Sequence, residues 1–185
     1  MHPAPFFRGN IMSIRQLAGI IDSLSVLIGK AGALILPLLV LTILVNVILR
    51  YTFNIGLIEL EELQWHLNAT VVMCCLAYAL KTDEHVRVDL FYNRLDSRGR
   101  DWVNVLGLLF LFLPFTALVG WNAWTIAAYS WELKEGSPMP SGLPARYIIK
   151  GIMALGMTLL MLQGVALLLR ALCRLFSPHA EEDRP

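Results

Sequence analysis

The stretch NVILRYTFNIGLIELEELQWHLNATVV, residues 46–72, places polar side chains between two long apolar runs. Its polar members include Arg50, Glu59, Glu61, Glu62, Gln64, His66 and Asn68. Inside a membrane such side chains are costly, and they mark active sites, ion paths or contacts with other helices. Which of these roles applies depends first on whether the flanking runs cross a membrane.

Composition and charge patterning predict an all-α integral membrane protein. Of the 185 residues, 57% are hydrophobic and 16% are charged, whereas soluble domains carry about 25% charged residues. A helix needs roughly 20 residues to cross a bilayer, and lipid offers the backbone no hydrogen-bond partners, so each span is helical. Uncharged runs predict four transmembrane helices, at about 31–50, 62–80, 102–131 and 146–170.

The positive charges predict that both termini face the cytoplasm. Eleven Lys and Arg residues lie before the first span, in the loop 81–101 and in the C-terminal tail, against four in the other two loops. Such residues concentrate on the cytoplasmic side. Apolar residues at helical spacing over 13–29 predict a helix that lies in the cytoplasmic interface, with a plain extension of the first span as the alternative. Pro114 predicts a kink in the third span.

On a helical wheel, the second span separates an apolar stripe from a wide polar arc. We expect the arc to face protein, because exposed polar groups at membrane depth are expensive. We expect lipid to touch only the apolar stripe, which consists of Leu60, Leu63, Leu67, Val71, Cys74 and Tyr78.

Catalysis and cofactor binding are weaker interpretations of the polar arc. Glu61 or Glu62 with His66 would supply an acid and a base, but no nucleophile, metal set or phosphate loop accompanies them. A haem or quinone site would need a second histidine inside a span, and the other three lie outside the spans: His2, His85 and His179. We therefore predict no enzyme activity and no cofactor, and the net charge of +1 gives no support for nucleic-acid binding.

A packing seam is the favoured interpretation. The carboxylates of the second span lie near the outer membrane boundary, where Arg50, Arg146 and Lys150 also arrive. Opposite charges at one depth neutralise each other, and interhelical hydrogen bonds from Gln64 and Asn68 contribute roughly 0.6 to 2 kcal/mol each. Four short helices have little internal surface for so many polar groups, so we expect a second membrane protein as the partner.

Several motifs resemble the small membrane subunit of tripartite ATP-independent periplasmic (TRAP) transporters. They are NVILRYTFNIG at 46–56, the pair Glu61-Glu62, HVRVDLFY at 85–92, and SGLPARYIIKGIMALGMTLLMLQGVALLLR at 141–170. The resemblance covers nearly the whole chain. Glu59 stands where the family often has tryptophan, and Glu84 where it commonly has glycine.

The resemblance implies a subunit of a sodium-driven importer in the bacterial inner membrane. A periplasmic solute-binding protein would deliver an organic acid, a large permease subunit would hold the sodium and substrate sites, and this chain would brace that subunit. A haem or quinone anchor and a homo-oligomeric channel remain alternatives. The candidate interface residues are Arg50, Tyr51, Glu61, Glu62, Gln64, His66, Asn68, His85, Arg87, Asp89, Arg146 and Lys150.

Overall fold

The computed structural model describes residues 5–82 and 96–176, and in these ranges the regular structure is helical throughout. The elements are α1 (Pro5–Thr52), α2 (Ile58–Lys81), α4 (Ser97–Leu106), the π-helical segment η1 (Gly107–Phe112), α5 (Leu113–Glu132) and α6 (Arg146–Phe176). Four stretches are long and apolar enough to cross a membrane: Gln16–Thr52, Ile58–Lys81, Gly99–Glu132 and Arg146–Leu175. The prediction of a four-span, all-α membrane protein is therefore confirmed.

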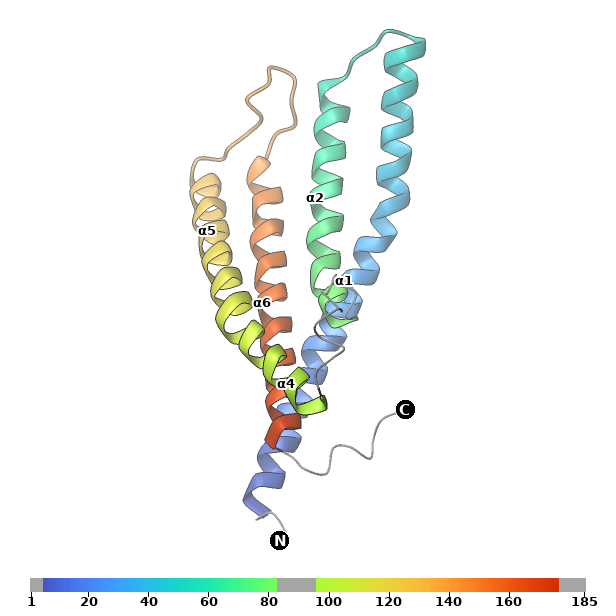
Figure 1. Cartoon of the computed structure of the whole chain (residues 1–185). Helices are drawn as coiled ribbons and strands as arrows, with labels where there is room; N and C mark the ends of the chain where they lie inside the picture. The colour runs from blue at the N-terminus through green and yellow to red at the C-terminus, as the bar shows by residue number, and fades with distance from the viewer. Residues whose placement is uncertain (1–4, 83–95, 177–185) are drawn as a thin grey trace.

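The two ends of the bundle differ in what they contain (Figure 1). The connections 53–57 and 133–145 lie together at one end, called here the loop end. The start of α1 and the end of α6 lie at the opposite end, called here the terminal end. The assignment of the terminal end to the cytoplasm stays a prediction from the charge distribution.

Helix α1 is one continuous helix of 48 residues, about 72 Å long at 1.5 Å per residue. The prediction of a separate interfacial helix over 13–29 is wrong in this respect, because no break separates these residues from the first span. The glycines near the expected break lie against α2 instead. A Cβ on Gly29 would come within 2.6 Å of Tyr78 Cβ, and one on Gly32 within 2.6 Å of Cys74 Cβ.

Helix α1 contacts the bundle through a narrow seam. Buried residues recur every seven positions along it: Ala18, Ser25, Gly32, Leu39 and Asn46. A seven-residue repeat keeps one face of a helix against its neighbour over many turns. Small side chains in that seam let the backbones approach closely, which favours helix association in lipid. Most of the remaining surface of α1 is exposed.

The predicted lipid-facing stripe of α2 is wrong for at least Val71, Cys74 and Tyr78. These residues face α1, where the Gly29 and Gly32 contacts occur, and Val71 is buried. The physical reason is that membrane helices have no water-driven preference for hiding apolar stripes and associate where small residues permit close packing. The predicted polar arc is divided between contacts with α1, contacts with the connection 133–145 and the exterior.

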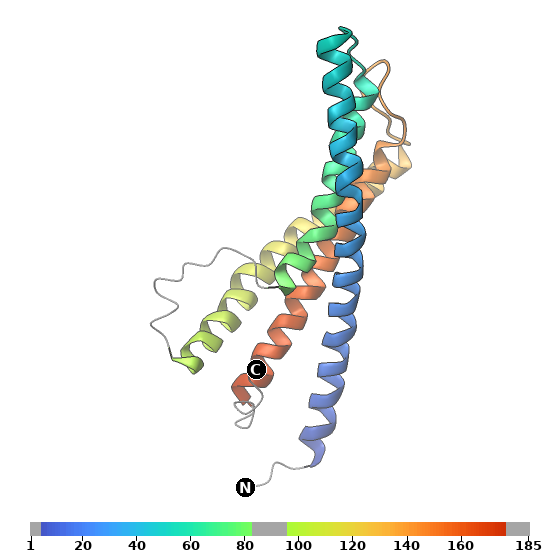
Figure 2. The ribbon, with the colours of Figure 1, turned by 90° about the vertical axis from the view of Figure 1, so that its right-hand side faces the viewer.

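Helix α6 is the centre of the bundle. Its most apolar window is 44% buried, against 22% or less in the other spans. It contacts α1, α2, α4 and α5, and Figure 2 shows it between α1 and the α4–α5 segment near the terminal end. Gly164 supports this packing, because a Cβ there would come 2.3 Å from the ring of Phe112.

The third span widens where the sequence predicts a kink. The π-helical turns of η1 end at Phe112, two residues before Pro114, and the amide of Leu113 donates to the carbonyl of Leu108, five residues back. Proline lacks an amide hydrogen and its ring would collide with the carbonyl four residues earlier, so a wider turn relieves the collision. Pro37 lies inside α1 as well, and the helix continues past it.

Candidate subunit interface

One charged pair joins α1 to α2 at the loop end. Arg50 Nη1 lies 2.7 Å from Glu61 Oε1, and the two side chains are 59% and 43% exposed. The sequence predicts these residues at one depth, and the structure brings them into contact. An exposed pair of this kind is worth little in water, so its effect depends on whether lipid or protein covers it.

Glu62 fixes the connection before α6. Its carboxylate accepts hydrogen bonds from the hydroxyl of Ser137 and from the amide of Leu143, the latter at 2.6 Å. Gly142 is needed for this approach, because a Cβ on it would come 2.8 Å from Glu62 Oε2. Arg146 attracts the same carboxylate electrostatically. The carboxylate therefore binds a loop of its own chain.

Lys150 pairs with a residue that sequence reasoning did not select. Its Nζ lies 2.5 Å from Glu135 Oε2 and donates to Ser130 Oγ at 2.7 Å. The expectation that Lys150 neutralises the carboxylates of α2 is therefore not met. The hydrogen bonds from Lys150 and Ser130 hold the pKa of Glu135 below its ordinary value. This cluster ties the end of α5 to the start of α6.

Two of the predicted polar residues are satisfied by backbone carbonyls. Gln64 Nε2 donates to the carbonyl of Thr42 at 3.3 Å, which adds an α1–α2 contact. His66 lies with Nδ1 2.6 Å from the carbonyl of Glu62, so this nitrogen carries the hydrogen that the carbonyl accepts. The Gln64 bond joins α1 to α2, whereas the His66 bond stays within α2.

A second set of residues on α2 points away from the bundle, and we call it the outer face of α2. It consists of the exposed residues Trp65, Asn68 and Val72, at helical spacing, and Glu61 lies at its edge next to Arg50. Trp65 is 75% exposed and Val72 is 44% exposed. Asn68 is exposed and has no hydrogen-bond partner within the described ranges. Tyr51 on α1 is 79% exposed at the loop end.

A buried polar network lies near the terminal end, and it was not predicted from the sequence. Gln163 Nε2 donates to Asp22 Oδ1 at 2.9 Å, and Ser25 Oγ donates to Gln163 Oε1 at 2.8 Å. Arg170 pairs with the other oxygen of Asp22. Ser25 and Gln163 are fully buried. The usable signal was the isolated polar residue in each apolar segment, but nothing in the sequence connects positions 138 or more residues apart.

The remaining predicted residues, His85, Arg87 and Asp89, lie outside the described residues. Within 5–82 and 96–176, no three His, Cys, Asp or Glu residues are grouped as a metal site would require. The polar residues that the structure does describe either lock this chain's own helices together or lie on the outer face of α2.

The described fold is that of a multi-pass helical membrane protein that carries an unpartnered polar residue on one exposed face. Residues 39–174 match the family model of the DctQ component of tripartite ATP-independent periplasmic transporters. The chain belongs to this family and is the small permease subunit of a TRAP transporter, a transport component and not an enzyme. Neither a curated protein nor a solved structure matches it.

Proposed function

We propose that this subunit braces the large permease subunit of a sodium-driven importer in the bacterial inner membrane. The imported solute is an organic acid that a periplasmic binding protein delivers. Family membership supports the transporter role and its partners. The haem or quinone anchor and the homo-oligomeric channel have no comparable support.

The observation that carries the brace proposal is the exposure of Asn68. It lies ten residues after the start of α2, about 15 Å along the helix axis and so near the middle of a hydrocarbon core about 30 Å thick. A side-chain amide that faces lipid there loses its hydrogen bonds to water and gains none. A partner helix against the outer face of α2 supplies these bonds and covers Trp65.

The continuity of the helices supports a bracing role over a transporting role. Substrate and ion sites of secondary transporters use interrupted helices near the bilayer midplane. Helices α1, α2 and α6 continue without interruption through their spans. The one irregular segment inside a described span, η1, has the wholly apolar sequence GLLFLF. We therefore place the sodium and substrate sites on the large subunit.

A matched pair of asparagine variants tests the proposed interface. Asn68→Leu removes the unpartnered amide, whereas Asn122→Leu changes an exposed asparagine of α5 whose amide already donates to the carbonyl of Leu118 at 2.9 Å. We expect Asn68→Leu to weaken co-purification with the large subunit by about threefold to thirtyfold, since such bonds contribute roughly 0.6 to 2 kcal/mol. Equal retention of the partner by both variants contradicts the assignment of this face.

Uptake by proteoliposomes separates a brace from an ion path. With the large subunit and the binding protein present, Asn68→Leu and Glu61→Ala should lower the amount of active complex and leave the sodium dependence of the residual uptake unchanged. Loss of sodium coupling in an intact complex would overturn the brace proposal. Sodium-driven uptake by the small subunit without the large one would overturn it as well.

A further inference from the structure

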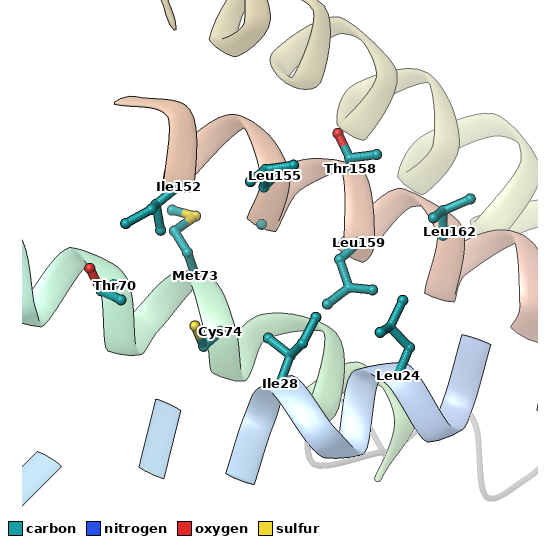
Figure 3. A pocket seen from close by; sticks show the side chains of 11 residues that line it. Leu24, Ile28, Thr70, Met73, Cys74, Ile152, Leu155, Thr158, Leu159 and Leu162 are labelled. Atoms are coloured by element: carbon teal, nitrogen blue, oxygen red, sulfur yellow. The ribbon is translucent and has the colours of Figure 1, made fainter. Parts of the chain in front are cut away.

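An apolar groove lies between α1, α2 and α6, with a cavity volume of about 480 Å³. Figure 3 shows Leu24 and Ile28 of α1 across from Leu159 of α6, with Met73 and Cys74 of α2 beside them. The volume falls within the roughly 300 to 1,000 Å³ of pockets that hold small molecules. The three helices therefore leave a ligand-sized space in the membrane-spanning part of the bundle.

The polar atoms along the groove are already engaged. The hydroxyl of Thr70 donates to the carbonyl of His66 at 2.8 Å, and that of Thr158 donates to the carbonyl of Ala154 at 2.9 Å. Both threonines are thereby satisfied within their own helices. The groove offers an occupant methyl groups, methylenes and sulfur, so its occupant is apolar along its length.

The groove is elongated and opens sideways. Along α6 it extends from Ile152 to Leu162, ten residues or about 15 Å. Leu24, Leu155 and Leu162 line it and are each at least 42% exposed. A laterally open apolar space about 15 Å long in a membrane span accommodates part of an extended hydrocarbon chain.

A cation lies beyond the terminal end of the groove. Arg170 follows Leu159, which lines the groove, by eleven residues, about 16 Å along α6 and on nearly the same face. Its guanidinium has five N–H donors, pairs with Asp22 through Nη2, and its side chain remains 32% exposed. At the loop end, Lys150 precedes Ile152 by two residues, but its ammonium group lies 2.5 Å from Glu135, and α2 presents the carboxylate of Glu62. The apolar groove is thus followed at the terminal end by a partly exposed guanidinium group, which keeps N–H donors beyond its pair with Asp22.

We propose that this groove binds an acyl chain of a phospholipid from the leaflet at the terminal end, with the lipid phosphate at Arg170. A helix of the large subunit fits less well, because Asn68 and Trp65 lie on the opposite side of α2 from Thr70 and Cys74. The acyl chain also fills the space that α1, α2 and α6 leave between them. The preference for a lipid over a helix of the large subunit rests on the proposed interface at Asn68, whereas the fit of an acyl chain rests on the groove and on Arg170.

Photoreactive phospholipids test the position and the direction of the chain. The full-length protein is placed in phosphatidylethanolamine and phosphatidylglycerol nanodiscs with a trace of lipid that carries a diazirine either near the carboxyl group or at the chain end. We expect the first probe to label peptides containing Leu24 and Leu162, and the second to label those containing Thr70 and Ile152. The reverse order, or labelling spread evenly over all exposed helix faces, overturns the proposal.

A matched tryptophan pair supplies the control. Leu24→Trp narrows the groove, whereas Leu34→Trp enlarges a side chain on the same helix that is 81% exposed and outside the groove. Excluding roughly two methylenes from the groove should lower labelling by about tenfold, and Leu34→Trp should leave it unchanged. Equal labelling of both variants overturns the proposal. So does a complex in which cysteines introduced along the groove crosslink to the large subunit and the lipid labelling disappears.

Discussion

The close approach of α1 and α2 predicts a large difference between two glycine variants of the same helix. A Cβ on Gly32 would lie 2.6 Å from Cys74 Cβ, whereas a Cβ on Gly19 meets no atom within 4 Å. Carbon atoms in contact are ordinarily about 3.5 to 4.0 Å apart. Gly32→Ala therefore forces α1 and α2 to separate by about 1 Å, whereas Gly19→Ala requires no movement of any neighbouring atom.

The magnitude follows from two opposing terms. Alanine is more favourable than glycine inside a helix by about 0.8 to 1.0 kcal/mol, and both substitutions gain this term. Only Gly32→Ala adds overpacking, which costs typically about 1 to 3 kcal/mol. Because the helix term cancels in the comparison, the free energy of unfolding of Gly32→Ala should lie about 1 to 3 kcal/mol below that of Gly19→Ala.

Unfolding in mixed micelles by titration with SDS measures this difference, with fluorescence of the five tryptophans as the signal. Adding Cys74→Gly to Gly32→Ala removes the opposing Cβ, so the double variant should recover part of the loss. Equal midpoints for the two single variants, or a double variant that shows no recovery, would refute the inferred contact between the helices.

Three further predictions concern the polar clusters. Glu62→Ala should make the connection before α6 cleavable by protease, whereas Glu61→Ala, which removes only an exposed pair, should not; equal cleavage would contradict the role of Glu62. The pKa of Glu135 is lowered from 4.5, so its contribution to stability is present above pH 4.5 and is lost as the pH falls through the lowered pKa. Glu135→Gln should therefore reduce the loss of stability in acid. An unchanged pH profile of stability would count against the cluster. Gln163→Leu removes the acceptor of the buried Ser25 hydroxyl and one donor to Asp22, and it should cost about 1 to 3 kcal/mol in SDS unfolding. A neutral effect would show that the network contributes nothing to stability.

The positions of the spans were predictable because the thickness of the bilayer sets the length of each apolar run. Charged residues end each apolar run. The continuity of residues 13–29 with the first span was not predictable in the same way. Gly29 and Gly32 contact α2 in this region, and the spacing of apolar residues along the sequence does not reveal such a tertiary contact.

Contacts in the candidate site were predictable only where two side chains must lie at the same depth in the membrane. Arg50 and Glu61 flank one short connection, so a shared depth made their contact a natural expectation. The partner of Glu62 was not predictable, because it lies 75 residues away in an irregular loop. The outward direction of Asn68 was also missed in part, since polarity alone does not say which polar residues a helix keeps for its own bundle.

The network of Ser25 and Asp22 with Gln163 and Arg170 has a consequence for how the subunit is made. The first span leaves the ribosome long before its partners in the last helix exist, because 138 and 148 residues separate the bonded pairs. Until α6 is inserted, the carboxylate of Asp22 and the hydroxyl of Ser25 have no network to join. The final closure of the bundle therefore waits for nearly complete synthesis, and a chain cut short before α6 lacks both Gln163 and Arg170 as partners for Asp22.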